Sequence, residues 1–218
     1  MIIPFILIFF VSIIILIIFL LTRDTCNLTP IEKTLDRDYL IKNTKNYSKL
    51  PTRLDKTIKG TSLIANKDIK KGDLLAYYKM KVYNSKDYKG INDNMYTFNV
   101  YNKANKHFRN LIADVYEDSI EQPINGITFW GHLANEPSVD QKPNSKIVTQ
   151  SNKNLEGDIK DGDIIVYELV ATKDIKKDDE ITWCYGGSYK RNYKICKDCE
   201  KNTSTNSLHS LLYKYFSY

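Results

Sequence analysis

One eleven-residue pattern occurs twice in this chain and constrains its fold more than any other feature. Leu63 to Asp73 reads LIANKDIKKGD, and Leu169 to Asp179 reads LVATKDIKKDD. Each copy places apolar residues before a polar turn, and runs rich in β-branched or aromatic residues follow, at Leu74 to Tyr78 and at Ile181 to Tyr185. Stacked-repeat folds need at least three units. Two copies therefore predict similar strand–turn–strand units at the two ends of one mostly β domain.

The residues between the two copies carry further strand and turn signals. Met95 to Tyr101 and Asn110 to Tyr116 are predicted strands. Asp161-Gly162 predicts a hairpin turn that leads into a strand from Ile164 to Tyr167.

The N-terminus has a different character from the rest of the chain. Ile2 to Leu21 contains only Pro4 and Ser12 outside the apolar set, and about 20 apolar residues at a rise of about 1.5 Å span the roughly 30 Å hydrocarbon core of a membrane. Residues 1–21 are therefore a predicted transmembrane anchor. A cleaved signal peptide is the alternative, but the basic start, short apolar stretch and small-residue cleavage site that it requires are missing.

Charges next to the anchor predict its orientation. Arg23, Lys33, Arg37 and Lys42 all follow the apolar run, and basic residues near the ends of a membrane helix stay in the cytoplasm. We expect a single-pass membrane protein whose C-terminal domain faces the cytosol. The four cysteines are too few and too unevenly placed for a disulfide framework, which agrees with a reducing compartment. The abundance of Lys, Asn, Ile and Tyr suits an A/T-rich coding sequence, such as that of a large DNA virus or an intracellular parasite.

A charged segment separates the anchor from the domain. Residues 22–58 lack glycine, and Thr29-Pro30 is a helix start signal that predicts a short helix at Ile31 to Leu40. We interpret 22–58 as a tether, 59–190 as the folded domain and 191–218 as a tail. Apolar residues at helical spacing in Leu208 to Tyr218 suit either a short helix that covers the functional site or ordinary core packing.

The charge pattern does not favour nucleic acid as a partner. The net charge is +6, but the lysines are interleaved with acids instead of forming a block. This arrangement is typical of a solvated surface, so we expect no direct nucleic-acid binding. The aromatic content, 12% of residues, excludes disorder of the whole chain.

Most common catalytic and metal-binding patterns are missing. The sequence has no phosphate loop, no dinucleotide fingerprint and no glycine-framed serine. His132 and Glu136 stand four residues apart, as metal ligands on a helix do, but no second histidine follows. Cys196 and Cys199 are one half of a zinc pair that Cys184 or His209 would have to complete. Zinc is thus a weak alternative, and no metal site is predicted.

Three unusual segments are not explained by the patterns above. They are Lys59 to Ala65 (KGTSLIA), Trp130 to Pro137 (WGHLANEP) with Pro143-Asn144, and Asp179 to Tyr189 (DEITWCYGGSY). With these segments the chain resembles the SET-domain lysine methyltransferases, from Lys59 to about Tyr189. The resemblance implies a mostly β, β-clip-like SET fold of small sheets with short helices, S-adenosylmethionine as cofactor, and protein lysines as substrate.

The resemblance also implies cofactor-binding residues. Gly60 matches the first glycine of the family's Gly-x-Gly turn, Ser62 replaces the second, and Leu63 continues the strand whose backbone approaches the cofactor. Asn135 matches the asparagine of the family's Asn-His motif, and Glu136 replaces the histidine. Ser is small, so main-chain contacts to the cofactor can survive at position 62.

Two tyrosines are the catalytic candidates that the resemblance implies. Tyr185 matches the tyrosine beside the methyl-transfer path and is also a cofactor-contacting candidate. Tyr78, or less clearly Tyr77, matches a tyrosine that lines the lysine channel. The alternative is that these are core aromatic residues.

The resulting prediction is a membrane-anchored protein-lysine N-methyltransferase acting on histone or nonhistone protein. The rival prediction is a noncatalytic SET-like module that binds a peptide or partner at a membrane. The departures from the family at Ser62 and Glu136 are its main support.

Overall fold

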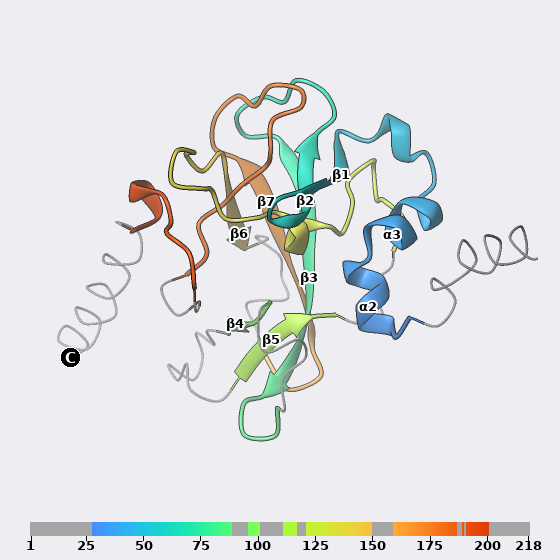
Figure 1. Ribbon diagram of the computed structural model, residues 1–218. Coiled ribbons are helices and arrows are strands. Elements are labelled where there is room, and N and C mark those ends of the chain that lie inside the picture. The colour runs from blue at the N-terminus through green and yellow to red at the C-terminus, as the bar shows by residue number, and fades with distance from the viewer. Residues whose placement is uncertain are drawn as a thin grey trace, which may run out of the picture.

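The computed structural model describes residues 28–88, 96–100, 111–116, 121–149, 159–186, 189 and 191–200. The predicted anchor at 1–21 and the tail segment at 208–218 lie outside these residues. Within them, no helix has the length and apolar character that crossing a membrane requires. The described part is mostly β, as the sequence predicts, with the short helices of residues 30–43 on one side of the sheets (Figure 1).

The helices and strands are short, apart from one long central strand. Their bounds are α2 Pro30–Leu35, α3 Arg37–Asn43, η1 Tyr47–Lys49, β1 Thr52–Thr57, β2 Gly60–Ala65, β3 Leu74–Asn84, β4 Phe98–Asn99, β5 Leu111–Val115, η3 Gly131–Leu133, β6 Ser145–Thr149 and β7 Ile164–Ala171. Residues 197–200 form a further helical turn.

All strand pairing between these elements is antiparallel. β1 and β2 form a two-stranded hairpin, and the other five strands form a sheet in the order β4-β5-β3-β7-β6. β3 is the centre of this sheet, and Tyr78, Met80 and Val82 alternate as its buried residues. That period of two is the pattern of a strand with one face in the core.

The two copies of the repeated pattern lie side by side and pair with each other. Ile69 and Ile175, both buried, exchange backbone hydrogen bonds, with N–O distances of 2.9 and 3.0 Å. The charged side chains repeat this symmetry, since Lys70 pairs with Asp174 and Lys176 pairs with Asp68, each at 2.8 Å. The sequence predicts two similar turns, and the structure shows that each is the other's partner.

Two of the predicted strands differ in the structure. Ile181 to Tyr185 forms no named strand, because its neighbours are different segments on either side: isolated bridges join Glu180 to Ile64 and Thr182 to Asn135. Within the predicted strand at 95–101, only Phe98–Asn99 is a strand among the described residues. The predicted strand at 110–116 is confirmed as β5, and the turn at Asp161-Gly162 leads into β7 as predicted.

The segment interpreted as a tether packs onto the domain. The predicted helix at 31–40 is split into α2 and α3 at Asp36, whose carboxylate accepts the Tyr39 N–H at 2.6 Å and so caps α3. The start at Thr29 is confirmed by a capping box with Glu32. Leu40 and Leu50 lie in the main core cluster, and the boundary at residue 59 falls inside the β1–β2 hairpin.

His132 in η3 joins the N-terminal helices to the middle of the domain. Its imidazole is buried, and Nε2 donates to the Thr34 carbonyl oxygen at 2.7 Å. Burial lowers the pKa of His132 to about 4, although the backbone hydrogen bonds to it act in the opposite direction. The ring is therefore neutral at physiological pH, and it serves the fold instead of a metal.

Acidification is expected to destabilise the protein through His132. The folded-state pKa of about 4 lies below the ordinary histidine value of about 6.5, so the unfolded chain binds more protons between these two values. Stability is then lost as the pH falls from about 6.5 toward 4. Between pH 7 and pH 4.5 the wild type should lose about 2 kcal/mol more free energy of unfolding than His132→Asn, measured by chemical denaturation. Equal losses in the two proteins would contradict this assignment.

Candidate active site

The three motif segments meet at one place in the fold. The segment from Asp179 to Tyr185 runs between β2 on one side and the residues after η3 on the other. Ile181 N donates to the Leu63 carbonyl at 2.8 Å, and Trp183 N donates to the Asn135 carbonyl at 3.1 Å. Residues more than 100 positions apart in the sequence are thereby held in one layer.

Asn144, from the Pro-Asn pair, holds the middle of this layer. Its Oδ1 accepts the Thr182 N–H at 2.8 Å, and its Nδ2 donates to the Glu180 carbonyl at 2.8 Å. The Asn144 side chain thus supplies backbone-like hydrogen bonds to Glu180 and Thr182, which have no continuous strand beside them. This explains why an asparagine is placed there.

Asn135 and Ser62 contact each other directly. Asn135 Nδ2 donates to Ser62 Oγ at 2.7 Å, and it also lies 3.3 Å from the Thr61 carbonyl and from Glu180 Oε1. Ser62 is fully buried, and its hydroxyl also shares a 2.7 Å hydrogen bond with Thr57 Oγ1. Ser62, which replaces the family's second glycine, therefore has its side chain buried and hydrogen-bonded inside the domain.

The turn before Ser62 requires a glycine. Gly60 has φ of +97°, a left-handed conformation that other residues adopt only with strain. Leu63, two positions beyond Thr61, is fully buried in the main core cluster. Its side chain anchors β2, and its carbonyl accepts the Ile181 N–H of the third motif segment.

Lys59 is a site residue for which the sequence predicted no role. Its Nζ donates to Glu180 Oε2 at 2.7 Å, to Gln141 Oε1 at 2.9 Å and to the Glu136 carbonyl at 3.1 Å. All three ammonium hydrogens therefore have acceptors. The side chain ties the first, second and third motif segments together.

Glu136 is buried, with 1% of its side chain exposed, and it does not share a site with His132. Its two carboxylate oxygens accept from the Tyr185 N–H at 2.9 Å and from the Arg191 guanidinium at 2.6 and 2.8 Å. Tyr193 OH also donates to it, at 3.2 Å. His132 and Glu136 therefore have separate structural roles, although they stand four residues apart in the sequence.

Tyr185 lies against the asparagine motif. Its hydroxyl donates to the Ala134 carbonyl at 3.1 Å, and its ring packs between Trp183 and Tyr189, with centroid distances of 5.1 and 4.8 Å. Burial, with smaller contributions from neighbouring tyrosines, raises the pKa of Tyr185 well above its usual value. The hydroxyl therefore stays protonated and remains a donor.

Tyr78 belongs to the same aromatic cluster, whereas Tyr77 does not. Tyr78 is 2% exposed, and its hydroxyl donates to the Tyr96 carbonyl at 3.1 Å. Phe98 connects it to the Tyr185 side, since the Phe98 ring lies 5.2 Å from Tyr78 and 5.8 Å from Trp183. Burial raises the pKa of Tyr78 well above its usual value, so its hydroxyl stays protonated.

Tyr77 points to a different neighbour. Its ring lies 5.2 Å from Phe129, on the other side of β3. The structure therefore supports Tyr78 over Tyr77 as the aromatic residue of the candidate site. Trp183 and Tyr189 lie in the third motif segment, and Tyr96 and Phe98 lie in the predicted strand at 95–101. The sequence assigned none of them a role in the site, because single aromatic residues suit any core.

Three cysteines, Cys184, Cys196 and Cys199, come together next to Tyr185. A disulfide joins Cys184 to Cys199, which differs from the expectation of reduced cysteines, and buried Cys196 has its sulfur 3.4 Å from that of Cys199. The disulfide ties the residue before Tyr185 to the tail. No cluster of three or more metal-ligating side chains that could hold an ion is found in the described part of the chain.

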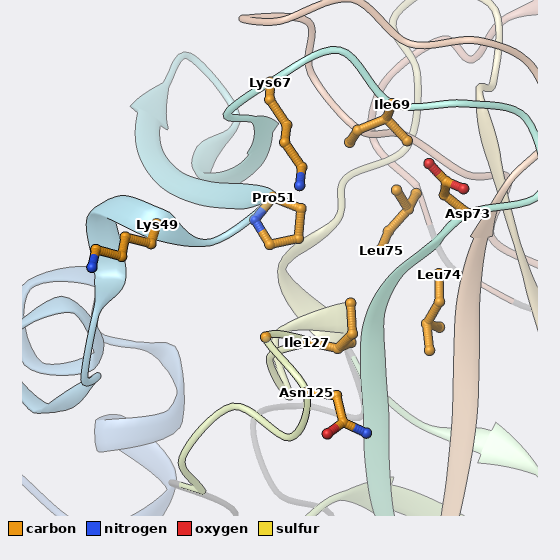
Figure 2. Close-up of a pocket in the computed structure, with 10 residues that line it drawn as sticks. Lys49, Pro51, Lys67, Ile69, Asp73, Leu74, Leu75, Asn125 and Ile127 are labelled. Atoms are coloured by element: carbon orange, nitrogen blue, oxygen red, sulfur yellow. The ribbon is translucent and has the colours of Figure 1, made fainter.

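A cavity of about 440 Å³ lies elsewhere, between Lys49 and Pro51, the start of β3 and the turn at Asn125 (Figure 2). Lys67, Ile69 and Ile127 are among the residues around it. Its lining contains none of the candidate site residues. The motif residues, and not this cavity, define the candidate site.

The family model described as the SET domain matches residues 60–186. A crystal structure of a candidate histone methyltransferase from Plasmodium falciparum is similar at 16% identity and a TM-score of 0.39, covering 62% of this chain and 91% of that one. The CpSET8 protein of Cryptosporidium is similar at 21% identity and a TM-score of 0.42, covering 76% of this chain and 77% of that one. No curated protein matches the chain.

Proposed function

Because the chain belongs to the SET-domain family, we propose that it is a protein-lysine N-methyltransferase that uses S-adenosylmethionine. The observation that carries the proposal is the convergence of Asn135, Tyr185 and the β2 edge. Tyr185 OH donates to the carbonyl of Ala134, the residue before Asn135, and Asn135 donates to Ser62 on β2. Residues from three segments that are distant in the sequence thus lie in contact, and these segments are the ones that match the family's motifs.

The residues present fit the cofactor. Gly60, Ser62 and Leu63 would offer main-chain contacts, since the Ser62 side chain is turned into the domain. Asn135 uses its amide nitrogen within the protein, while its Oδ1 accepts no hydrogen bond from the described residues and is suited to accept one from a ligand. Glu136, whose carboxylate is committed to protein donors, would contribute through its main chain and through Arg191.

The cofactor supplies a sulfonium whose methyl group is already activated for transfer. The protein must bring a neutral amine in line with that methyl and hold it there. A lysine with a pKa of about 10.4 costs roughly 4.6 kcal/mol to deprotonate at pH 7, at about 1.36 kcal/mol per pKa unit. The aromatic cluster of Tyr78, Phe98, Trp183 and Tyr185 lowers this cost, because desolvation disfavours the ammonium form.

Calorimetric titration of the purified full-length chain with S-adenosylmethionine is the first test. We expect saturable binding, followed by transfer of labelled methyl to lysines of protein substrates, with histone and nonhistone proteins assayed in parallel. Binding without transfer to any protein, or no binding by a well-folded sample, would favour the noncatalytic SET-like module instead. The replacements at Ser62 and Glu136 are the observations behind that second candidate.

We further propose that the enzyme acts at a membrane surface with its domain in the cytosol. The support is the apolar run Ile2 to Leu21 and the basic residues after it. Glycosylation sequons at Asn27, Asn46 and Asn202 provide a test in cells. They should remain unmodified, and occupied sequons would place the domain on the lumenal side.

A further inference from the structure

Arg191 connects the segment after Tyr185 back to the candidate site. Its Nε lies 2.6 Å from Glu136 Oε2 and its Nη2 lies 2.8 Å from Glu136 Oε1, which makes the ion pair bidentate. Only 12% of the Arg191 side chain and 1% of the Glu136 side chain are exposed. Two parallel charge-assisted hydrogen bonds fix both distance and orientation, which a single point contact does not.

The remaining guanidinium donors go to main-chain carbonyls near Tyr185. Arg191 Nη2 donates to the carbonyls of Tyr185 at 3.0 Å and Gly186 at 3.1 Å, and Nη1 donates to that of Tyr189 at 2.9 Å. Glu136 Oε1 accepts the N–H of Tyr185 at 2.9 Å. The ion pair therefore holds Tyr185 by its N–H through one partner and by its carbonyl through the other.

The pair is itself held in place at both ends. Lys59 Nζ donates to the Glu136 carbonyl, and Tyr193 OH donates to the Glu136 carboxylate. The Arg191 guanidinium also lies over the Tyr189 ring, 5.3 Å from its centroid. Every acceptor position of the buried carboxylate faces a protein donor, so the arrangement leaves little freedom for Tyr185.

We propose that Glu136 and Arg191 are a positioning pair that sets the place of Tyr185 in the methyl-transfer site. This inference rests on the proposed methyltransferase function. It also gives a structural reason for Glu136. The glutamate that replaces the family's histidine is the ion-pair partner of Arg191. An acid at position 136 is what a buried arginine at position 191 requires.

The test uses Glu136→Gln, Arg191→Gln and the double variant, with Arg53→Gln as the matched control. Arg53 forms an arginine–carboxylate pair with Asp178 at 2.8 Å, outside the candidate site. We expect each single Gln variant to reduce kcat by about 100-fold, since a misplacement of about 1 Å costs that much. The KM for protein substrate should change little, because Tyr185 acts after binding. The double variant should lose no more than either single variant, since both remove the same interaction.

Arg191→Lys separates positioning from stability. It keeps the charge beside Glu136 but loses the bidentate geometry, so we expect it to fold and still to lose most of kcat. Normal kcat in this variant would overturn the proposal, as would additive losses in the double variant. Should the Gln variants fail to fold, Arg191→Lys alone decides.

Backbone amide hydrogen exchange tests the pair independently of any activity. The Tyr185 amide should lose protection in Glu136→Gln and Arg191→Lys and keep it in Arg53→Gln. Unchanged protection in all variants would overturn the positioning role even in an active enzyme. The Tyr185 amide could lose protection in these variants while the wild type shows no methyl transfer. That result would support the positioning of Tyr185 by the pair and contradict the methyltransferase function, so the two failures are distinguishable.

Discussion

Replacing Tyr185 with phenylalanine is expected to reduce methyl transfer by about 100- to 1,000-fold while the fold is retained. The phenylalanine ring keeps the packing between Trp183 and Tyr189. What it loses is the hydroxyl that donates to the Ala134 carbonyl at 3.1 Å. Because burial keeps the pKa of that hydroxyl high, the group lost is a neutral donor that orients neighbours, and not a base.

Single-turnover transfer of labelled methyl, with thermal unfolding measured on the same samples, checks this expectation. Tyr77→Phe is the matched control, because Tyr77 packs against Phe129 outside the aromatic cluster. The control should transfer at the wild-type rate. Normal turnover by Tyr185→Phe would reduce Tyr185 to a packing residue and remove the main support for catalysis.

Asn135→Ala is expected to weaken S-adenosylmethionine binding by about 10- to 100-fold, the equivalent of one or two lost hydrogen bonds. The asparagine joins β2 to the third motif segment through Ser62 and Glu180. Alanine removes this link and the free acceptor Oδ1 together. The effect should therefore be larger than the loss of one ligand contact alone.

Calorimetric titration of Asn135→Ala and Ser62→Gly measures this expectation. Ser62→Gly restores the family's glycine and removes the Ser62–Asn135 hydrogen bond but keeps Asn135 Oδ1, so its affinity should fall less than that of Asn135→Ala. Circular dichroism confirms that both variants are folded. Equal affinities in Asn135→Ala and wild type would place the cofactor site elsewhere.

The strongest local patterns predicted the fold well. The repeated turns, the helix start at Thr29 and the strand that became β5 were all readable, because each depends on residues close in sequence. The strand prediction at Ile181 to Tyr185 was wrong because strand pairing depends on neighbours. There the neighbours are β2, Asn135 and Asn144, three separate segments.

The candidate site was predictable where the family's motifs reach it. Asn135, Tyr185 and the β2 edge lie together, whereas the choice of Tyr78 over Tyr77 needed the structure. Adjacent residues on a strand face opposite sides, and the sequence does not state which side faces the site. Arg191 had no signal at all, because a lone arginine near a chain end is ordinary in any sequence.

The sequence by itself determined the family, the mostly β architecture and the positions of the motif residues. These follow from local residue types and their order along the chain. Only the tertiary structure decided which side chains meet: Glu136 with Arg191, Ser62 with Asn135, Cys184 with Cys199. Contacts across long sequence separations depend on how the chain returns to the same place. That path is fixed by the packing of the whole core, and no short pattern records it.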